Sequence, residues 1–67
     1  MRKLTYLVTE EGKQSQKIYS LEFITDRTPS WTEQQYLRNR TNCSMNLIAE
    51  EQTDETVAVA RYIMNFE

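Results

Sequence analysis

Few side chains of this 67-residue sequence could take part in covalent chemistry, since it has no histidine, one cysteine and one glycine. The absence of histidine excludes a Ser-His-Asp triad, a Cys-His pair and imidazole metal ligands. A single glycine cannot form the loops that cradle phosphates in nucleotide-binding enzymes. Because no histidine can activate the thiol of Cys43, we expect this residue to be structural. The chain is therefore predicted not to be an enzyme and to use no cofactor.

Carboxylates are the most abundant groups that could act as acids, bases or metal ligands. The doublets Glu10–Glu11 and Glu50–Glu51 would point to opposite faces of a strand, so neither doublet is suited to form a close catalytic pair. Residues 50–55 offer several oxygen ligands, but they lack the glycine and the alternating Asp/Asn pattern of a calcium-binding loop. We expect solvated carboxylates and no metal site.

The same stretch forms a predicted charge patch. No basic residue lies between Thr41 and Ala60, where the sequence places four acidic residues. These predicted partner-binding residues are Glu50, Glu51, Asp54 and Glu55. Gathered without compensation at a hairpin tip, they would attract a larger protein with a basic surface, such as a nucleic-acid-binding groove. The alternative is a charged tip that only keeps the protein soluble and discourages edge pairing.

A second group of residues combines aromatic and basic side chains. If they are exposed rather than packed on the sheet, Trp31 and Tyr36 could anchor a contact with a partner protein. Together with Arg38 and Arg40 at the end of a predicted helix, they also suit an alternative function, in which a small regulator contacts DNA or RNA. The formal net charge of −2 argues against nucleic acid as the partner.

The pattern of apolar residues predicts a β-hairpin in the first third of the chain. Residues 3–9 and 17–25 alternate with the two-residue period of half-buried strands. The polar segment between them contains Gly12, the only glycine of the sequence, and therefore predicts a turn.

One short helix is predicted after the hairpin. Ser30 and Glu33 have the spacing of a capping box, with Thr32 and Gln35 as a second register. We expect the helix to run from Trp31 to about Arg40. Its expected inward side consists of Trp31, Gln34, Tyr36 and Leu37.

The last third of the chain leaves two alternatives open. Residues 45–50 alternate like a strand, whereas residues 56–66 fit either a strand or a helix capped by Asp54. The β-branched start of this last segment favours the strand. The sequence therefore predicts one domain, residues 1–67, of the α+β class: an antiparallel sheet with one helix packed on a face, in the order ββαββ, with ββαβα as the alternative.

Length and composition also bear on location and assembly. The N-terminal stretch is too short and polar for a signal peptide, and no run approaches the roughly 20 apolar residues of a membrane span. We expect a cytoplasmic protein. A sheet covered by one helix has a second face and two edges, so we expect a homodimer or a partner-bound state to cover the surplus apolar residues. These residues are Leu7, Ile18, Ile24, Val57 and Val59.

Taken together, these features predict a small acidic protein-binding module that inhibits or modulates a larger protein. In size, charge and expected topology, the whole chain resembles the small phage-encoded proteins that inhibit host polymerases, nucleases or defence complexes. The resemblance implies a viral protein that acts in the host cytoplasm. A DNA- or RNA-binding regulator and a structural oligomeric subunit are the alternative functions.

Overall fold

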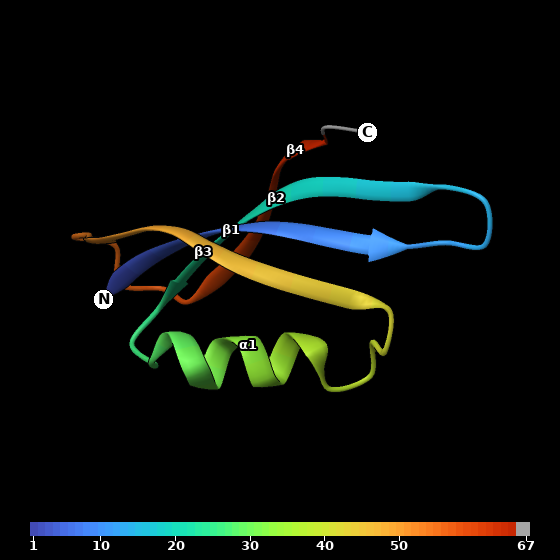
Figure 1. Ribbon diagram of the computed structural model, residues 1–67. Helices are drawn as coiled ribbons and strands as arrows, with labels where there is room; N and C mark the ends of the chain where they lie inside the picture. Colours follow the sequence, from blue (N-terminus) through green and yellow to red (C-terminus); the bar gives the residue numbers. More distant parts are fainter. Residues whose placement is uncertain (66–67) are drawn as a thin grey trace.

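A computed structural model describes residues 1–65 of the chain, and the side chains of residues 1–63. It contains four strands and one helix, in the predicted ββαββ order (Figure 1). The elements are β1 (Arg2–Glu11), β2 (Gln16–Thr25), α1 (Pro29–Leu37), β3 (Cys43–Gln52) and β4 (Val59–Asn65). The α+β fold class is thus confirmed, and the last segment is a strand rather than a helix. Phe66, which was predicted to belong to that strand, lies outside the described residues.

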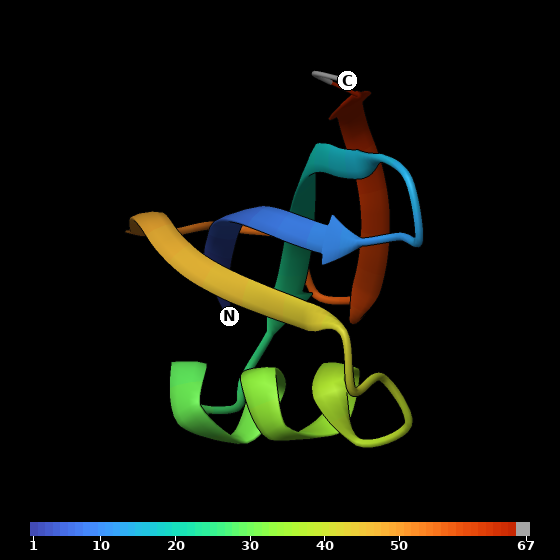
Figure 2. The ribbon, with the colours of Figure 1, turned by 45° about the vertical axis from the view of Figure 1, so that its right-hand side comes forward.

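The four strands form one sheet in the order β3-β1-β2-β4, in which every neighbouring pair is antiparallel. β1 and β2 form the central hairpin, and β3 and β4 are the two edges. The connection from β2 to β3 passes through α1, which lies across one face of the sheet (Figure 2). Residues 53–58 then lead from one edge of the sheet to the other. Because β3 and β4 do not pair, the prediction of a hairpin tip at residues 50–55 is wrong.

The central hairpin supplies most of the core. Its register pairs Leu4 with Phe23, Tyr6 with Leu21, and Val8 with Tyr19. Because cross-strand partners share a face, these side chains gather beneath α1. The three β1 side chains of this set are fully buried, and Tyr36 of the helix and Met45 of β3 pack against the cluster. Each fully buried aliphatic side chain contributes about 1.5–3 kcal/mol to the free energy of folding.

The hairpin turn depends on its glycine. The amide of Gly12 donates a hydrogen bond to the carbonyl oxygen of Ser15 at 2.7 Å. A Cβ atom at Gly12 would lie 2.8 Å from the same oxygen, which is closer than real Cβ atoms come. The turn therefore accepts only glycine without a shift of its backbone.

The helix begins earlier and ends earlier than the sequence pattern predicted. Thr28 is the N-cap, because its Oγ1 accepts a hydrogen bond from the amide of Trp31 at 3.1 Å. Pro29 follows at the first helical position, where its missing N–H costs no hydrogen bond. This pair therefore replaces Ser30 as the start signal. The helix ends at Leu37 rather than at Arg40.

The inward side of α1 also differs from the prediction. Thr32 is the buried residue of the helix, and Tyr36, one turn later, contacts the core. Trp31 and Gln34 are exposed, so their predicted inward position is wrong. The helix faces the sheet through the row that Thr32 and Tyr36 define, and Trp31 is rotated away from that row by about 100°. Within residues 1–65, α1 falls short of the length and apolar character that a membrane-crossing helix requires.

Both edge strands contain an irregularity. The register of β3 against β1 shifts between Thr5 and Tyr6, which leaves Ile48 as an extra residue. The register of β4 against β2 shifts between Ser20 and Leu21, which leaves Ile63 as an extra residue. Each shift is a β-bulge, which bends an edge strand and interrupts its regular hydrogen-bonding pattern.

Candidate functional site

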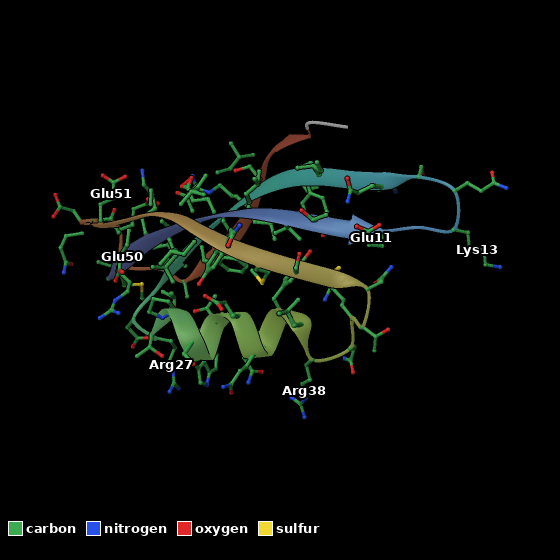
Figure 3. All side chains as sticks on the ribbon, viewed as in Figure 1. Glu11, Lys13, Arg27, Arg38, Glu50 and Glu51 are labelled. Carbon is green, nitrogen blue, oxygen red and sulfur yellow. The ribbon has the colours of Figure 1, made fainter. Side chains whose placement is uncertain are left out.

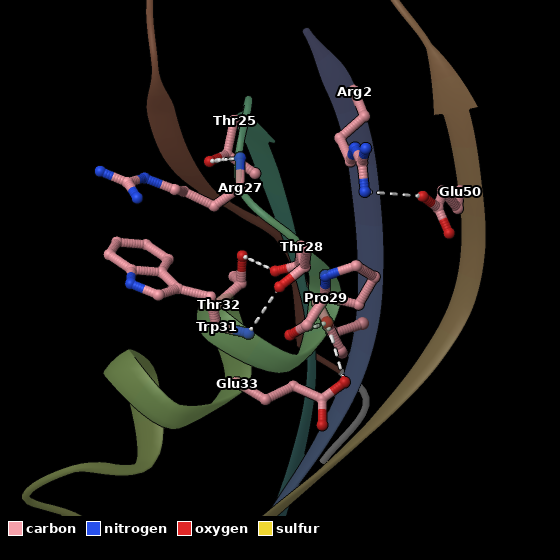
Figure 4. A network of polar contacts seen from close by, with 10 residues as sticks. Arg2, Thr25, Arg27, Thr28, Pro29, Trp31, Thr32, Glu33 and Glu50 are labelled. Atoms are coloured by element: carbon pink, nitrogen blue, oxygen red, sulfur yellow. Dashed lines mark hydrogen bonds and ion pairs between the residues drawn. The ribbon is translucent and has the colours of Figure 1, made fainter.

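Ion pairs compensate most of the predicted acidic patch. Three pairs join its residues to cations: Arg2–Glu50 at 3.4 Å, Lys3–Glu51 at 3.4 Å and Arg61–Glu55 at 3.1 Å. Figure 4 shows the first of them, between β1 and β3. The prediction of an uncompensated patch is therefore wrong for three of its four residues, and Asp54 is the member that has no ion pair within the described residues.

Two of the three ion pairs follow from the sheet register, whereas Arg61 and Glu55 are only six residues apart in the sequence. β3 runs antiparallel to β1, so the start of β1 lies beside the end of β3. Lys3 pairs directly with Glu51 in this register, and the side chain of Arg2 reaches Glu50. Glu50 and Glu51 lie together at the end of β3 (Figure 3). A scan for nearby opposite charges in the sequence cannot find partners that are nearly fifty residues apart.

An open groove lies between α1 and β4. Its volume is about 390 Å³. Three aromatic residues line it, Phe23 from β2 and Trp31 and Tyr36 from α1, and so do the aliphatic residues 58–60. Because Ala60 pairs with Phe23 and carries only a methyl group, the start of β4 leaves this apolar surface uncovered. Gln35 and Arg40 supply polar groups to the lining.

Two arginines make cation–π contacts with the aromatic side chains of α1. The guanidinium carbon of Arg27 lies 4.8 Å from the ring centre of Trp31, and that of Arg40 lies 4.1 Å from the ring centre of Tyr36. Arg40 also donates a hydrogen bond to the carbonyl oxygen of Tyr36 at 2.9 Å. Trp31 remains 41% exposed although Arg27 stacks on it (Figure 4). The cation–π contacts therefore orient aromatic surface that is still available to a ligand.

The two arginines of the predicted nucleic-acid site are separated. Arg40 lines the groove, whereas Arg38 is the C-cap of α1 and does not line it. Figure 3 shows Arg38 pointing away from the sheet. The structure thus brings Trp31, Tyr36 and Arg40 together from the sequence-predicted residues, and places Arg38 and the four acidic residues elsewhere.

Tyrosine hydroxyl groups fasten the helix to the sheet. The hydroxyl of Tyr6 donates to Glu33 Oε2 at 2.9 Å. The hydroxyl of Tyr19 lies 3.1 Å from Glu10 Oε1 and 2.7 Å from the hydroxyl of Tyr36. Because an ionised carboxylate only accepts hydrogen bonds, Tyr19 donates to Glu10 and Tyr36 donates to Tyr19. These contacts fix the helical wall of the groove.

The hydroxyls of Tyr6 and Tyr19 and the thiol of Cys43 are not activated for nucleophilic chemistry. Burial, followed by the hydrogen bond to Glu33, raises the pKa of Tyr6 well above its ordinary value. Burial and the hydrogen bond to Tyr36 do the same for the pKa of Tyr19. Burial raises the pKa of the Cys43 thiol as well, and the charge of Glu10 adds to the effect. All three groups stay protonated at neutral pH, so none is suited to act as a nucleophile.

Within residues 1–65, no three His, Cys, Asp or Glu side chains are grouped so that they could hold a metal ion. Comparisons of the chain with protein-family models, curated proteins and solved structures find no match. The site must therefore be interpreted from its own geometry and chemistry. The sequence indicated Trp31 and Tyr36 but not the groove, because the groove depends on which strand lies next to β2. The small side chains of Ala58 and Ala60 were its local signal.

Proposed function

We propose that this chain is a protein-binding module that holds a segment of a larger protein in the groove between α1 and β4. One observation carries the proposal: an apolar groove stays open to solvent although aromatic side chains line it and arginines hold two of them in place. Protein-binding surfaces concentrate their affinity in tryptophan, tyrosine and arginine residues around an apolar centre. Trp31, Tyr36 and Arg40 are of these types.

The charges around the groove favour an acidic segment over a basic one. No acidic residue belongs to the lining, whereas Arg40 does and has no ion pair within the described residues. Arg27 stacks on Trp31 at the border of the groove, and its exposed guanidinium lies 3.9 Å from the carboxylate of Asp26. The acidic residues that were expected to attract a basic partner are largely occupied by Arg2, Lys3 and Arg61. We therefore place the partner contact at the groove and not at residues 50–55.

A selection of displayed random peptides tests this function. Peptides enriched on the full chain should share large apolar residues flanked by Asp or Glu. Their binding should fall by about tenfold or more in Trp31→Ala, because truncation of a central aromatic residue at an interface costs about 2 kcal/mol or more. The matched control is Ile48→Ala, which removes another exposed apolar side chain far from the groove lining. Equal binding to both variants, or no enrichment at all, would contradict the proposal.

The same variants test the nucleic-acid alternative. Aromatic rings backed by arginines are also the means by which proteins stack single-stranded bases, so a short single-stranded oligonucleotide is measured alongside the peptides. We expect weak binding that disappears as salt rises, because the chain is acidic overall. Tight oligonucleotide binding that is lost in Trp31→Ala would instead make this groove a nucleic-acid site.

A further inference from the structure

We infer that the partner segment binds as an added β-strand along the free edge of β4, with its apolar side chains in the groove and its acidic side chains beside Arg27 and Arg40. This inference rests on the proposed function and specifies the conformation and chemistry of the segment. It follows from the position of β4, from the small side chain of Ala60 on that strand, and from the charges at the groove.

The edge of β4 is available for pairing. β4 is the last strand of the sheet and, within residues 1–65, it pairs with β2 alone. The strand edge on its other side therefore presents backbone N–H and C=O groups that an extended peptide can pair with, as in other complexes formed by strand addition. The bulge at Ile63 interrupts this edge. Val59 and Ala60, which border the groove, belong to the regular part before the bulge, so a short strand suffices to reach it.

The small side chain of Ala60 on β4 allows the added strand to fill the groove. Whether the added strand is parallel or antiparallel, each of its side chains points to the same face of the sheet as the β4 residue beside it. Ala60 lies on the same face as its partner Phe23, which lines the groove and packs against the core. A large apolar residue beside Ala60 would meet no side chain beyond a methyl group on β4. It could lean across the strand towards Phe23 and Trp31.

Charge distinguishes a partner protein from a second copy of this chain. Arg27 and Arg40 lie at opposite ends of the helical wall, beside Trp31 and Tyr36 respectively. Arg40 favours an acidic residue at its end of the bound segment, and Arg27 favours one less strongly because Asp26 already lies 3.9 Å from it. β4 of a second copy carries one arginine and no acidic residue between Val59 and Asn65. Self-pairing of β4 would therefore bring no carboxylate to Arg27 and Arg40.

The opposite face of β4 has its own counter-charges. Arg61 pairs with Glu22 at 3.8 Å and with Glu55 at 3.1 Å. Residue 61 alternates with Ala60, so this cluster lies on the other face of the strand. Acidic residues of the partner are therefore expected beside the groove and are not required next to Arg61.

Backbone methylation of a selected peptide tests the inference. N-methylation removes one amide donor without changing the side chain, so we expect it to weaken binding by about tenfold at alternate positions and much less at the positions between them. Uniform sensitivity, or a period of three to four residues as in a bound helix, would overturn the added strand even if Trp31→Ala still abolishes binding. In that case the groove would remain the binding site and the proposed function would stand.

Hydrogen exchange on the full chain locates the pairing. We expect the peptide to slow exchange in β4 and to leave β3 unchanged. Replacement of the acidic residues of the peptide by their amides should weaken binding by several-fold, and Arg40→Gln should remove that difference. If the free chain at micromolar concentration is a dimer by light scattering and its β4 amides are already protected, the edge belongs to a second copy and the inference is wrong.

Discussion

The two edge strands of the sheet, β3 and β4, differ in how well neighbouring elements and ion pairs protect them. β3 ends in Glu50 and Glu51, which pair with cations of β1, and α1 packs against this strand. β4 carries Arg61 as its single charged residue, and it borders an open apolar groove instead of a helix. Both strands contain a bulge at an exposed isoleucine, Ile48 or Ile63. Since proteins normally blunt exposed sheet edges, the less protected edge is the one at which we expect binding.

The largest predicted difference lies between the covered half of the sheet and β4. Leu4 on β1 is fully buried in the core, whereas Val59 on β4 is 37% exposed. Leu4→Ala should lower the free energy of unfolding by about 2–5 kcal/mol, which is a large part of the total for so small a domain. Val59→Ala should change it by about 0.5 kcal/mol or less. Urea unfolding followed by circular dichroism measures both, and similar losses would show that β4 belongs to the core.

Alkaline pH should lower the stability of the protein through the tyrosines that join α1 to the central hairpin. Tyr6 and Tyr19 hold α1 on the sheet, and burial raises the pKa of each above its ordinary value near 10. Above about pH 10 the unfolded chain therefore loses tyrosine protons that the folded chain retains, so stability falls as the pH rises further. Below that pH the contribution is fully present and does not vary.

Unfolding measured in urea at a series of alkaline pH values checks this expectation. Tyr19→Phe provides the control, since it removes one of the two raised tyrosines and should reduce the slope of stability against pH. A slope that is unchanged in this variant would mean that the buried hydroxyl of Tyr19 does not cause the alkaline loss.

At neutral pH, the hydroxyl pair that joins helix and sheet should have a smaller effect. Tyr19→Phe leaves the hydroxyl of Tyr36 without its acceptor and Glu10 without its donor, which should cost about 1–2 kcal/mol. Tyr36→Phe should cost less than Tyr19→Phe, because it removes a single hydrogen bond of the group. A double-mutant cycle in urea unfolding should give a coupling of about 0.5 kcal/mol or more between the two residues. Additive losses would contradict a shared hydrogen bond.

Local patterns predicted the elements well and their arrangement poorly. The hairpin of β1 and β2 could be predicted because alternation and a glycine turn are properties of adjacent residues. The helix start was misplaced because Thr28–Pro29 and Ser30–Glu33 both satisfy capping rules, and only the folded chain shows that Glu33 accepts a hydrogen bond from Tyr6. The strand order could not be predicted, since either late strand could pair with either side of the hairpin.

The same limit explains the candidate site. Lys3 and Glu51 have no reason to meet until β3 is placed beside β1. The groove likewise exists only because β4 is placed beside β2 and begins with the small residue Ala60 next to Phe23. A sequence can indicate which aromatic residues are suited to binding, but the surface that they share depends on contacts between distant segments.

The smallest predicted effect compares the ion pairs of the two edges. Glu51→Gln removes an exposed pair with Lys3 on β3, which should cost about 0.2–1 kcal/mol and vanish in high salt. Arg61→Gln on β4 should cost more, because the side chain of Glu22 is only 14% exposed and would be left without its cation. Urea unfolding at low and high salt measures both variants. If the two losses are equal and equally sensitive to salt, then Glu22 is hydrated like a surface carboxylate, and the charge on β4 does no more to hold that edge in place than the charges on β3.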